Sequence, residues 1–264
     1  MIHTEITSRD NQHLVRARKV RDGVERELIF IEGKRLTQEA LRSEIEIVDA
    51  FVADDFGDQK LLNTLEAGGV SFAMVPARLF KTIADTDTSQ GIILLAARPV
   101  NLLSTIEARL GNFPLVVFLK EINNPSNLGA ILRTAEAAGV AGVITSTKSA
   151  DVYSTKAIRA AMGSSFRVPV WENLDFEAVL AWAKKEKLIA TAATGNADCS
   201  YTQINWKVPR LLIFGSEAHG LNSSELDLVD EKIRIPIEDN VESLNLAVSA
   251  GIMLFEAKRQ TAAT

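Results

Sequence analysis

The stretch NNPSNLGAILRTAEAAGV, residues 123–140, gathers short polar side chains at the start of an alanine-rich helix. Asn124 precedes Pro125, which biases its backbone toward an extended conformation and places the helix start close to it. Ser126 or Asn127 is then predicted to cap the helix by accepting hydrogen bonds from backbone amides. Unpaired amides and the positive end of the helix dipole favour an anion such as phosphate at this position.

The same helix carries an arginine near its start. Arg133 follows Gly129 by four residues and therefore lies on the same helix face. Helical side chains lean toward the N-terminus, so Arg133 is expected to extend over Gly129 toward Asn127. An amide and a forked cation would then converge at one helix end. Taken alone, the stretch fits a well-capped helix with a surface arginine equally well.

The sequence around this stretch alternates between apolar strands and helices. PLVVFLK, residues 114–120, is a nearly unbroken apolar run, which is typical of a parallel strand covered on both faces. The remaining predicted strands and the last helix are 140–145, 168–171, 188–194, 210–215, 232–237 and about 244–260. This alternation predicts an α/β domain with a mostly parallel sheet and helices on both sides.

The first hundred residues predict a second, smaller α/β unit. Its predicted helices are 12–21, 34–43 and 58–69, and its predicted strands are 27–33, 46–54, 70–75 and 91–97. Residues 98–114 break this rhythm with two prolines and a glycine. We therefore expect domains at 1–100 and 113–264, joined by a linker at 101–112.

Composition narrows the class of protein. The chain has 264 residues with 29 basic and 34 acidic side chains, a net charge of −5. Cys199 is its one cysteine and its three histidines are scattered, so we expect neither an intrachain disulfide nor a metal site. No apolar run is long enough to span a bilayer, and the N-terminus lacks the apolar region of a secretory signal. These features predict a cytoplasmic protein.

Basic side chains gather near the N-terminus at Arg9, Arg16, Arg18, Lys19 and Arg21. The negative net charge argues weakly against a nucleic-acid partner, but local patches matter more than totals. A solvated helix face is the simpler interpretation of this run by itself.

Ligands of open α/β sheets bind beyond the carboxyl ends of the strands, so two further loops are of interest. In IFGSEAHGLN, residues 213–222, a strand ends at Gly215 and is followed by Glu217 and Gly220. Two glycines around one carboxylate allow a ligand to approach the backbone closely. The pattern is not a dinucleotide-binding G-x-G-x-x-G, and an ordinary strand–helix loop would also fit it.

The other loop lies between a strand that ends near Pro236 and the last helix. Ser243 and Asn245 stand at or just before the start of that helix. The helix then carries the small residues Ala247, Ser249, Ala250 and Gly251, which would let another backbone pack closely.

Together and in this order, the three loops resemble the SpoU family of the SPOUT superfamily, S-adenosylmethionine-dependent RNA ribose 2′-O-methyltransferases. Asn127, Gly129 and Arg133 match the first motif of that family. Gly215, Glu217, Gly220 and Leu221 match the second motif. Ile235, Pro236, Ser243, Leu244 and Asn245 match the third, and the likeness covers roughly residues 113–260.

The resemblance implies a deep trefoil knot in the C-terminal domain and a homodimer formed through that domain. FIEGKRLTQEAL, residues 30–41, and the basic helix before it are similar to the substrate-binding domain of rRNA-type members, which folds like ribosomal protein L30e. An rRNA substrate is therefore favoured, with a tRNA substrate and a catalytically silent RNA-binding relative as alternatives. A nucleotide-binding enzyme with a doubly wound fold is a further alternative, which the missing glycine fingerprint disfavours.

The resemblance also assigns candidate site residues. Those implied in catalysis are Arg133, Asn127, Glu217, Ser243 and Asn245. Those implied in holding S-adenosylmethionine are Thr194, Gly195, Gly215, Ile235 and Leu244. Those expected to contact RNA are Arg9, Arg16, Arg18, Lys19, Arg21 and Arg35.

The family view makes Arg133 the group that accepts the ribose proton, assisted by a substrate phosphate. Because a guanidinium is a very poor base, a phosphate clamp is the physically safer role. Glu217 is expected either to hold Arg133 or to order the cofactor loop. One departure affects that loop: Ile237 and Asp239 stand where many relatives have methionine and glycine.

Overall fold

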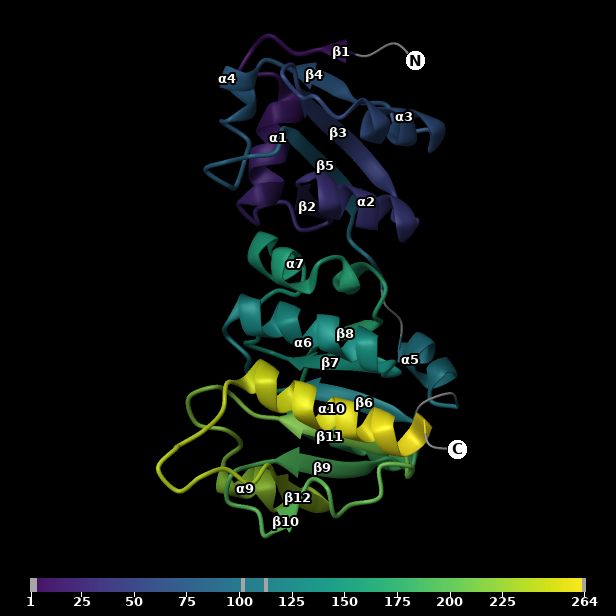
Figure 1. Cartoon of the computed structure of the whole chain (residues 1–264), viewed down its shortest axis with the longest axis vertical. Coiled ribbons are helices and arrows are strands. Elements are labelled where there is room, and N and C mark those ends of the chain that lie inside the picture. Colours follow the sequence, from purple (N-terminus) through teal and green to yellow (C-terminus); the bar gives the residue numbers. More distant parts are fainter. Residues whose placement is uncertain (1–3, 101–102, 112–113, 263–264) are drawn as a thin grey trace. The chain divides into compact units, whose positions relative to one another are not determined.

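The computed structural model describes residues 4–100, 103–111 and 114–262 (Figure 1). The chain divides into two compact units. The first contains the chain up to Val100 together with Tyr153–Phe166, and the second contains Asn101–Val152 and the chain from Arg167 onward. Segment 153–166 thus groups with the first unit, although the sequence predicted one uninterrupted domain from residue 113.

The first unit contains a five-stranded sheet in the order β1-β4-β3-β5-β2. The strands are β1 (Thr4–Glu5), β2 (Leu28–Glu32), β3 (Ile47–Ala53), β4 (Ala73–Val75) and β5 (Ile92–Ala97). β5 runs antiparallel to β2 and β3, whereas β1 and β3 run parallel to β4. Strands β2 to β5 lie where the sequence predicted them; β1 is two residues long and gave no periodic signal.

The helices of the first unit are α1 (Gln12–Arg21), α2 (Lys34–Arg42), α3 (Gln59–Ala67), α4 (Ala77–Phe80), α7 (Thr155–Ala161) and the 3-10 helix η1 (Ser164–Phe166). Leu14, Ala17 and Val20 of α1 are spaced three residues apart and enter one core cluster with Phe30 and Phe51 of the sheet. That spacing places them on one face of α1, so the charged residues between them point away from the core.

The second unit contains a seven-stranded parallel sheet in the order β10-β12-β9-β11-β6-β7-β8. The strands are β6 (Leu115–Leu119), β7 (Gly142–Ser146), β8 (Val170–Leu174), β9 (Ile189–Ala193), β10 (Cys199–Ser200), β11 (Arg210–Phe214) and β12 (Glu231–Arg234). The predicted mostly parallel sheet is confirmed. β6 and β11 are buried along their whole length, as their unbroken apolar sequences indicate.

The helices of the second unit are α5 (Leu103–Arg109), α6 (Pro125–Ala138), α8 (Phe176–Lys185), α9 (Ser223–Leu226) and α10 (Leu246–Ala262). α5 occupies most of the segment that the sequence predicted as a linker. Its Ile106 is fully buried, and a Cβ at Gly142 would lie 2.6 Å from the Ile106 Cγ1 atom. This seven-residue helix is short, and the flanking prolines and glycine concealed it.

The two faces of the parallel sheet are covered by different helices. Val116 and Phe118 of β6 pack in one cluster with Phe176 and Trp182 of α8. α6 and α10 pack side by side (Figure 1), with Gly251 of α10 facing Thr134 of α6. Burial of each large apolar side chain contributes roughly 1.5–3 kcal/mol, which fixes both layers against the sheet.

The strand order creates a switch point between β6 and β11. β7 follows β6 on one side, whereas β9 and β12 continue the sheet on the other side of β11. The connections that leave the carboxyl ends of β6 and β11 therefore diverge, which is the usual place for a ligand site in an open parallel sheet. No helix among the described residues is long and apolar enough to cross a membrane.

Candidate active site

Asn124 caps the start of α6. Its side-chain oxygen accepts hydrogen bonds from the amides of Ser126 (2.9 Å) and Asn127 (3.4 Å), and its backbone is extended. Pro125 occupies the first helical position, where the missing amide costs nothing. The prediction that Ser126 or Asn127 is the cap is wrong, because the residue before the proline already has both the extended backbone and the acceptor.

Glu217 is the anion at this helix start. Its two carboxylate oxygens accept hydrogen bonds from the backbone amides of Asn123 (3.2 Å) and Asn124 (3.3 Å). The side-chain amide of Asn127 donates to the same carboxylate at 3.2 Å. The sequence predicted an anion such as phosphate here, and within the chain a carboxylate from a loop about 90 residues away fills that place.

Asn127 joins all three loops. Its amide nitrogen donates to Glu217, and its carbonyl oxygen accepts from the side chain of Asn245 at 3.1 Å. Asn245 in turn caps α10, because its oxygen accepts from the amides of Ala247 (2.9 Å) and Val248 (3.3 Å). These two bonds fix the orientation of the Asn127 amide, and they bring three distant segments of the chain to one point.

Arg133 is exposed on α6 and has no polar partner among the residues that the structure describes. The acceptors of Glu217 are directed at the amides of the helix start instead. Of the two roles predicted for Glu217, holding Arg133 therefore has no contact in its favour. The guanidinium of Arg133 remains available to a ligand.

The loop around Glu217 doubles back on itself. Its backbone forms a bridge between Ser216 and Gly220, with the Gly220 amide donating to the Ser216 carbonyl at 2.9 Å. A Cβ at position 215 would lie 2.2 Å from the Gly220 carbonyl carbon, and Gly220 has a left-handed φ of 64°. The two glycines are thus required by the close approach of the chain to itself. The interpretation of the sequence had explained both glycines by the close approach of a ligand.

The predicted cofactor residues lie at one edge of the sheet. Thr194 and Gly195 follow β9, Gly215 follows β11, and Ile235 follows β12, three strands that are neighbours in the sheet. Leu244 is half-buried just before α10. Gly195 is exposed with open space where a Cβ would lie, so a main-chain-bound cofactor can approach it. Ser243 is exposed in the same segment as Leu244.

The six predicted RNA-contacting cations fall into two groups. Arg16 pairs with Glu25 and Asp49. Arg18 donates to Thr82 and to the Arg9 carbonyl. Arg21 donates to Asp22 and to the carbonyls of Thr82 and Ala84. The side chains of Arg9, Lys19 and Arg35 are exposed and have no recorded partner among the described residues. The first group holds α1 in place, and the second group is free to bind a ligand.

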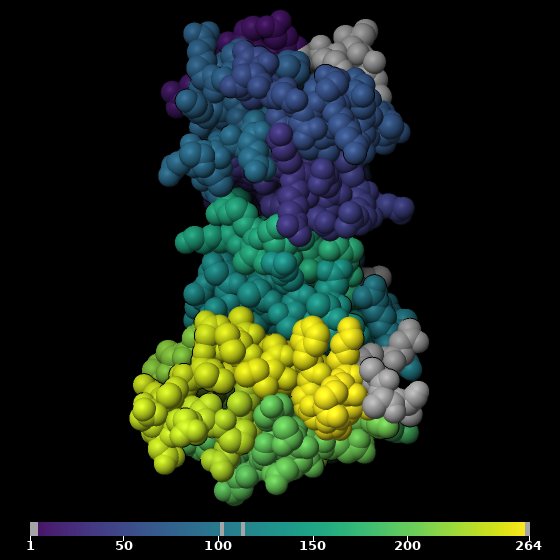
Figure 2. Space-filling view, viewed as in Figure 1, coloured from purple at the N-terminus to yellow at the C-terminus, as the bar shows by residue number. Residues whose placement is uncertain are grey.

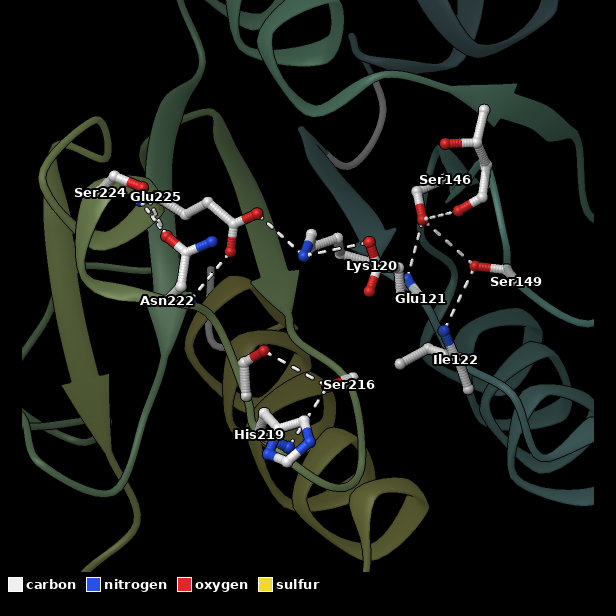
Figure 3. A network of polar contacts seen from close by, with 12 residues as sticks. Lys120, Glu121, Ile122, Ser146, Ser149, Ser216, His219, Asn222, Ser224 and Glu225 are labelled. Carbon is white, nitrogen blue, oxygen red and sulfur yellow. Dashed lines mark hydrogen bonds and ion pairs between the residues drawn. The ribbon is translucent and has the colours of Figure 1, made fainter.

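Sequence reasoning missed an ion pair beside the site (Figure 3). Lys120, the residue after β6, contacts Glu225 of α9 at 2.8 Å and Glu121 at 3.4 Å. Burial alone would lower the pKa of Lys120, but the hydrogen bond and charge of Glu225, with those of Glu121, raise it above its ordinary value. The spacing of Asn222 and Glu225 matches a capping box and was recognisable, whereas nothing in the sequence pointed to Lys120.

The fold and the three converging loops define a SPOUT-type methyltransferase, and comparison with known proteins agrees. A model described as the SpoU rRNA Methylase family matches residues 114–255. A second model, described as RNA 2′-O ribose methyltransferase substrate binding, matches residues 30–101. The chain belongs to the SpoU rRNA methylase family, which confirms the resemblance inferred from the three loops.

Individual relatives resemble the chain along nearly its whole length. The 23S rRNA (guanosine(2553)-2′-O)-methyltransferase RlmP of Bacillus subtilis is 30% identical over 96% of this chain and 99% of its own. The crystal structure of an AdoMet-bound rRNA methyltransferase from Sinorhizobium meliloti has a TM-score of 0.82 at 28% identity and covers 97% of both chains. A crystal structure of an RNA 2′-O ribose methyltransferase has a TM-score of 0.81 at 30% identity and covers 98% of this chain and 100% of that one.

Proposed function

We propose that this protein transfers the methyl group of S-adenosylmethionine to a ribose 2′-hydroxyl of ribosomal RNA. The observation that carries the proposal is the junction at Asn127, where Glu217 and Asn245 bind one side-chain amide from two distant loops. Membership of the SpoU rRNA methylase family and the substrate named in the relatives support the same conclusion.

The reaction forms a bond between the ribose 2′-oxygen and the methyl carbon, breaks the carbon–sulfur bond and releases the hydroxyl proton. S-adenosylmethionine supplies the electrophilic methyl group on a positively charged sulfur. The protein must hold the weakly nucleophilic hydroxyl in line with that methyl group and stabilise the negative charge that develops on the oxygen.

Asn127 is suited to orient the ribose. A side-chain amide has two N–H donors and an oxygen with two lone pairs. Glu217 takes one donor and Asn245 takes one lone pair, so one donor and one lone pair remain for the RNA. Because both internal bonds are already made, Asn127 needs no reorganisation when the substrate binds.

Arg133 is suited to bind phosphate. It stays protonated at any physiological pH, so it acts as a forked donor rather than as a base. Its exposure and its lack of a polar partner among the described residues leave the guanidinium free for a substrate phosphate or for the developing oxyanion. The proton of the 2′-hydroxyl then passes to a substrate phosphate or to solvent.

The cofactor is assigned to the sheet edge formed by β9, β11 and β12. The main chain at Gly195, Gly215, Ile235 and Leu244 is expected to hold it, with Thr194 beside the first of these. Asp239, which replaces the glycine of many relatives, lies in an exposed turn two residues after Ile237. We assign no cofactor contact to Asp239 or to Ile237.

RNA binding is assigned to the first unit, because the substrate-binding model matches residues 30–101 and all but the last of these lie in that unit. Arg9, Lys19 and Arg35 are the candidates, since their exposed side chains have no polar partner in the described part of the chain. A tRNA substrate is the alternative. The relative RlmP is a bacterial rRNA methyltransferase, and bacteria assemble ribosomes in the cytoplasm, so we propose the cytoplasmic location that the sequence predicted.

We further propose a homodimer formed through α10, and a knotted chain path. α10 lies at the molecular surface (Figure 2), and it exposes Val248 and Phe255, which are two helical turns apart. The small residue Gly251 faces α6 of the same chain, so the outer apolar pair is the more suitable contact for a partner. The proposal of a knot rests on membership of the SpoU family, whose resemblance implied it.

The experiment that tests the proposed function is a methyl-transfer assay. Purified protein is incubated with radiolabelled S-adenosylmethionine and unmodified rRNA, or with tRNA as the competing substrate. The RNA is then digested to nucleosides. Label in a 2′-O-methylnucleoside from rRNA is the expected result. Label in a methylated base, or no label above a heat-inactivated sample, would contradict the proposal.

A further inference from the structure

We propose that the ion pair between Lys120 and Glu225 is a positioning device for the methyl-transfer site. It would act through Glu217 and would not touch the substrate. The proposal rests on the proposed function, since it concerns the geometry of the same site. It assigns a role to two residues that lie outside the three matched motifs.

The pair is close and poorly exposed. The Lys120 Nζ atom lies 2.8 Å from Glu225 Oε1 (Figure 3), and the two side chains are 13% and 12% exposed. Lys120 directly follows β6, and Glu225 lies in α9, which directly follows the loop that carries Glu217. The pair therefore connects the segment before the α6 start with the segment after the Glu217 loop.

Glu225 divides its two oxygens between two tasks. Oε1 contacts Lys120, and Oε2 accepts the backbone amide of Asn222 at 2.9 Å. The Asn222 side chain accepts the Glu225 amide at 2.9 Å, which completes a capping box. One carboxylate thus fixes the end of the Glu217 loop and attaches it to the end of β6.

These contacts close a ring. From Lys120 the backbone runs to Asn123 and Asn124, whose amides donate to Glu217. From Glu217 the backbone runs to Asn222 and Glu225, and Glu225 returns to Lys120. The Lys120 amide also donates to the Phe214 carbonyl at 2.9 Å, so the start of the loop is held by β6. The contact between Lys120 and Glu225 holds the end of the loop to the same residue, which fixes the orientation of Glu217 from both sides.

The segment between the two attachments is held from the other side by β7 and the turn after it. The Glu121 amide donates to Ser146 Oγ at 2.7 Å, and the Ile122 amide donates to Ser149 Oγ at 3.2 Å (Figure 3). Glu121 has a left-handed φ of 54°, a conformation that side chains disfavour. Because Glu121 adopts this disfavoured conformation, the surrounding contacts must determine the path of the segment.

A purely stabilising role explains the pair less well. Ion pairs that are largely removed from water contribute little net stability compared with well-packed apolar side chains of the same size, because both charges lose their hydration. They do impose a defined geometry. Methyl transfer depends on such geometry, since a displacement of about 1 Å at a reacting group can reduce the rate about 100-fold.

The test compares two identical substitutions in the second unit. Glu225→Gln keeps an acceptor for Asn222 but removes the ion pair. Glu256→Gln is the matched control: Glu256 is 11% exposed, pairs with Arg259 and lies in α10, away from the Glu217 loop. We expect Glu225→Gln to lower kcat for rRNA about tenfold or more, with S-adenosylhomocysteine affinity changed less than about threefold. Glu256→Gln should leave kcat unchanged.

A second comparison separates positioning from stability. Lys120→Met leaves the Glu225 charge without its partner, so both Tm and kcat should fall. The double variant Lys120→Met/Glu225→Gln removes both charges and should recover Tm while kcat stays low. Lys120→Arg keeps the charge pair and should retain most of the activity. If kcat recovers together with Tm in the double variant, the pair is structural and the proposal fails.

Amide hydrogen exchange gives a readout that needs no substrate. Glu225→Gln should accelerate exchange in a peptide that spans residues 121–124, and Glu256→Gln should not. Unchanged exchange in Glu225→Gln would overturn the inference even if the wild type methylates rRNA. Conversely, a wild type without methyl transfer would overturn the proposed function, and the exchange result would still decide whether the pair orders this loop.

Discussion

The two ends of the seven-stranded parallel sheet both carry polar networks, and the networks differ in what they leave unused. At the carboxyl end, Asn127 is bonded to Glu217 and Asn245 yet keeps a free donor and a free lone pair, and Arg133 has no protein partner among the described residues. At the amino end of β11, Arg210 is 2% exposed and bonds to Thr191, Glu231 and the carbonyl of Asn205.

The difference between the two networks indicates that one stabilises the fold and the other binds a ligand. The network around Arg210 is directed inward, and its guanidinium also lies over the ring of the buried Trp206. Both terminal nitrogens of Arg210 are bonded within the chain, and its Nε atom is buried without a partner among the described residues, so the network offers little to a ligand. The network around Asn127 is exposed and only partly satisfied within the chain, so its remaining donor and lone pair can exchange water for a ligand. Polar groups at the carboxyl end are therefore expected to control activity, and those at the amino end to control stability.

The largest expected effect is at Arg133. Arg133→Ala should reduce methyl transfer to rRNA by about 1,000-fold or more, because no other described cation of the α6 start replaces its phosphate contact. S-adenosylhomocysteine affinity, measured by calorimetry, should remain within about twofold of the wild type. Equal loss of activity and cofactor affinity would show that Arg133 belongs to the cofactor site instead.

The opposite outcome is expected at Arg210. Arg210→Leu should lower the free energy of unfolding by about 2 kcal/mol, because it leaves the buried Thr191 hydroxyl without its guanidinium partner and removes the ion pair with the partly exposed Glu231. Urea unfolding measures this change. Below the unfolding transition kcat should stay near the wild-type value, and a large loss of kcat in the folded variant would break the distinction between the two networks.

Helices and strands were predictable from the sequence where their apolar pattern is long. The apolar run of β6 and the fourteen-residue α6 are long enough to give their type and place, whereas the seven-residue α5 is too short to be seen by periodicity. The three loops were identified as candidates by their motifs. Their meeting at Asn127 depends on strand order, which places β11 beside β6, and no local pattern encodes that order.

The basic N-terminal helix shows the same limit of local patterns. A run of arginines in sequence suggests a binding face, yet Arg16, Arg18 and Arg21 bond to groups within the first unit. Whether a cation is free depends in part on residues far along the chain, such as Asp49 for Arg16 and Thr82 for Arg18. The sequence alone could not sort these cations into structural and available ones.

Substitution of the three cations without a polar partner among the described residues should have a moderate effect on RNA affinity. The triple variant Arg9→Glu, Lys19→Glu, Arg35→Glu should weaken rRNA binding about tenfold or more at 0.1 M salt and reduce the slope of log affinity against log salt by about 2. Lys207→Glu, an exposed cation at the amino end of the second-unit sheet, is the control. If the triple variant and the control bind alike in a filter-binding assay, RNA contacts the first unit elsewhere.

The smallest expected effect concerns Glu256. Hydrogen bonds from Arg259 and then from Gln260 lower the pKa of Glu256 from 4.5 to about 2. A carboxyl with a lowered pKa stabilises the fold above pH 4.5, and that contribution is lost as the pH falls toward 2. Because Arg259 is well exposed, Glu256→Gln should cost about 1 kcal/mol at pH 7 and less at pH 3. A loss that does not shrink at pH 3 would contradict the ion pair.

The most direct test of the central claim is a single-turnover methyl-transfer assay with Asn127→Ala and the wild type. Saturating S-adenosylmethionine and limiting rRNA are used, and the 2′-O-methylnucleoside is quantified by mass spectrometry. We expect the wild type to form this nucleoside, and Asn127→Ala to form it about 100-fold more slowly with unchanged cofactor affinity. A wild-type rate in Asn127→Ala would contradict the claim that the three loops meet there to hold the ribose.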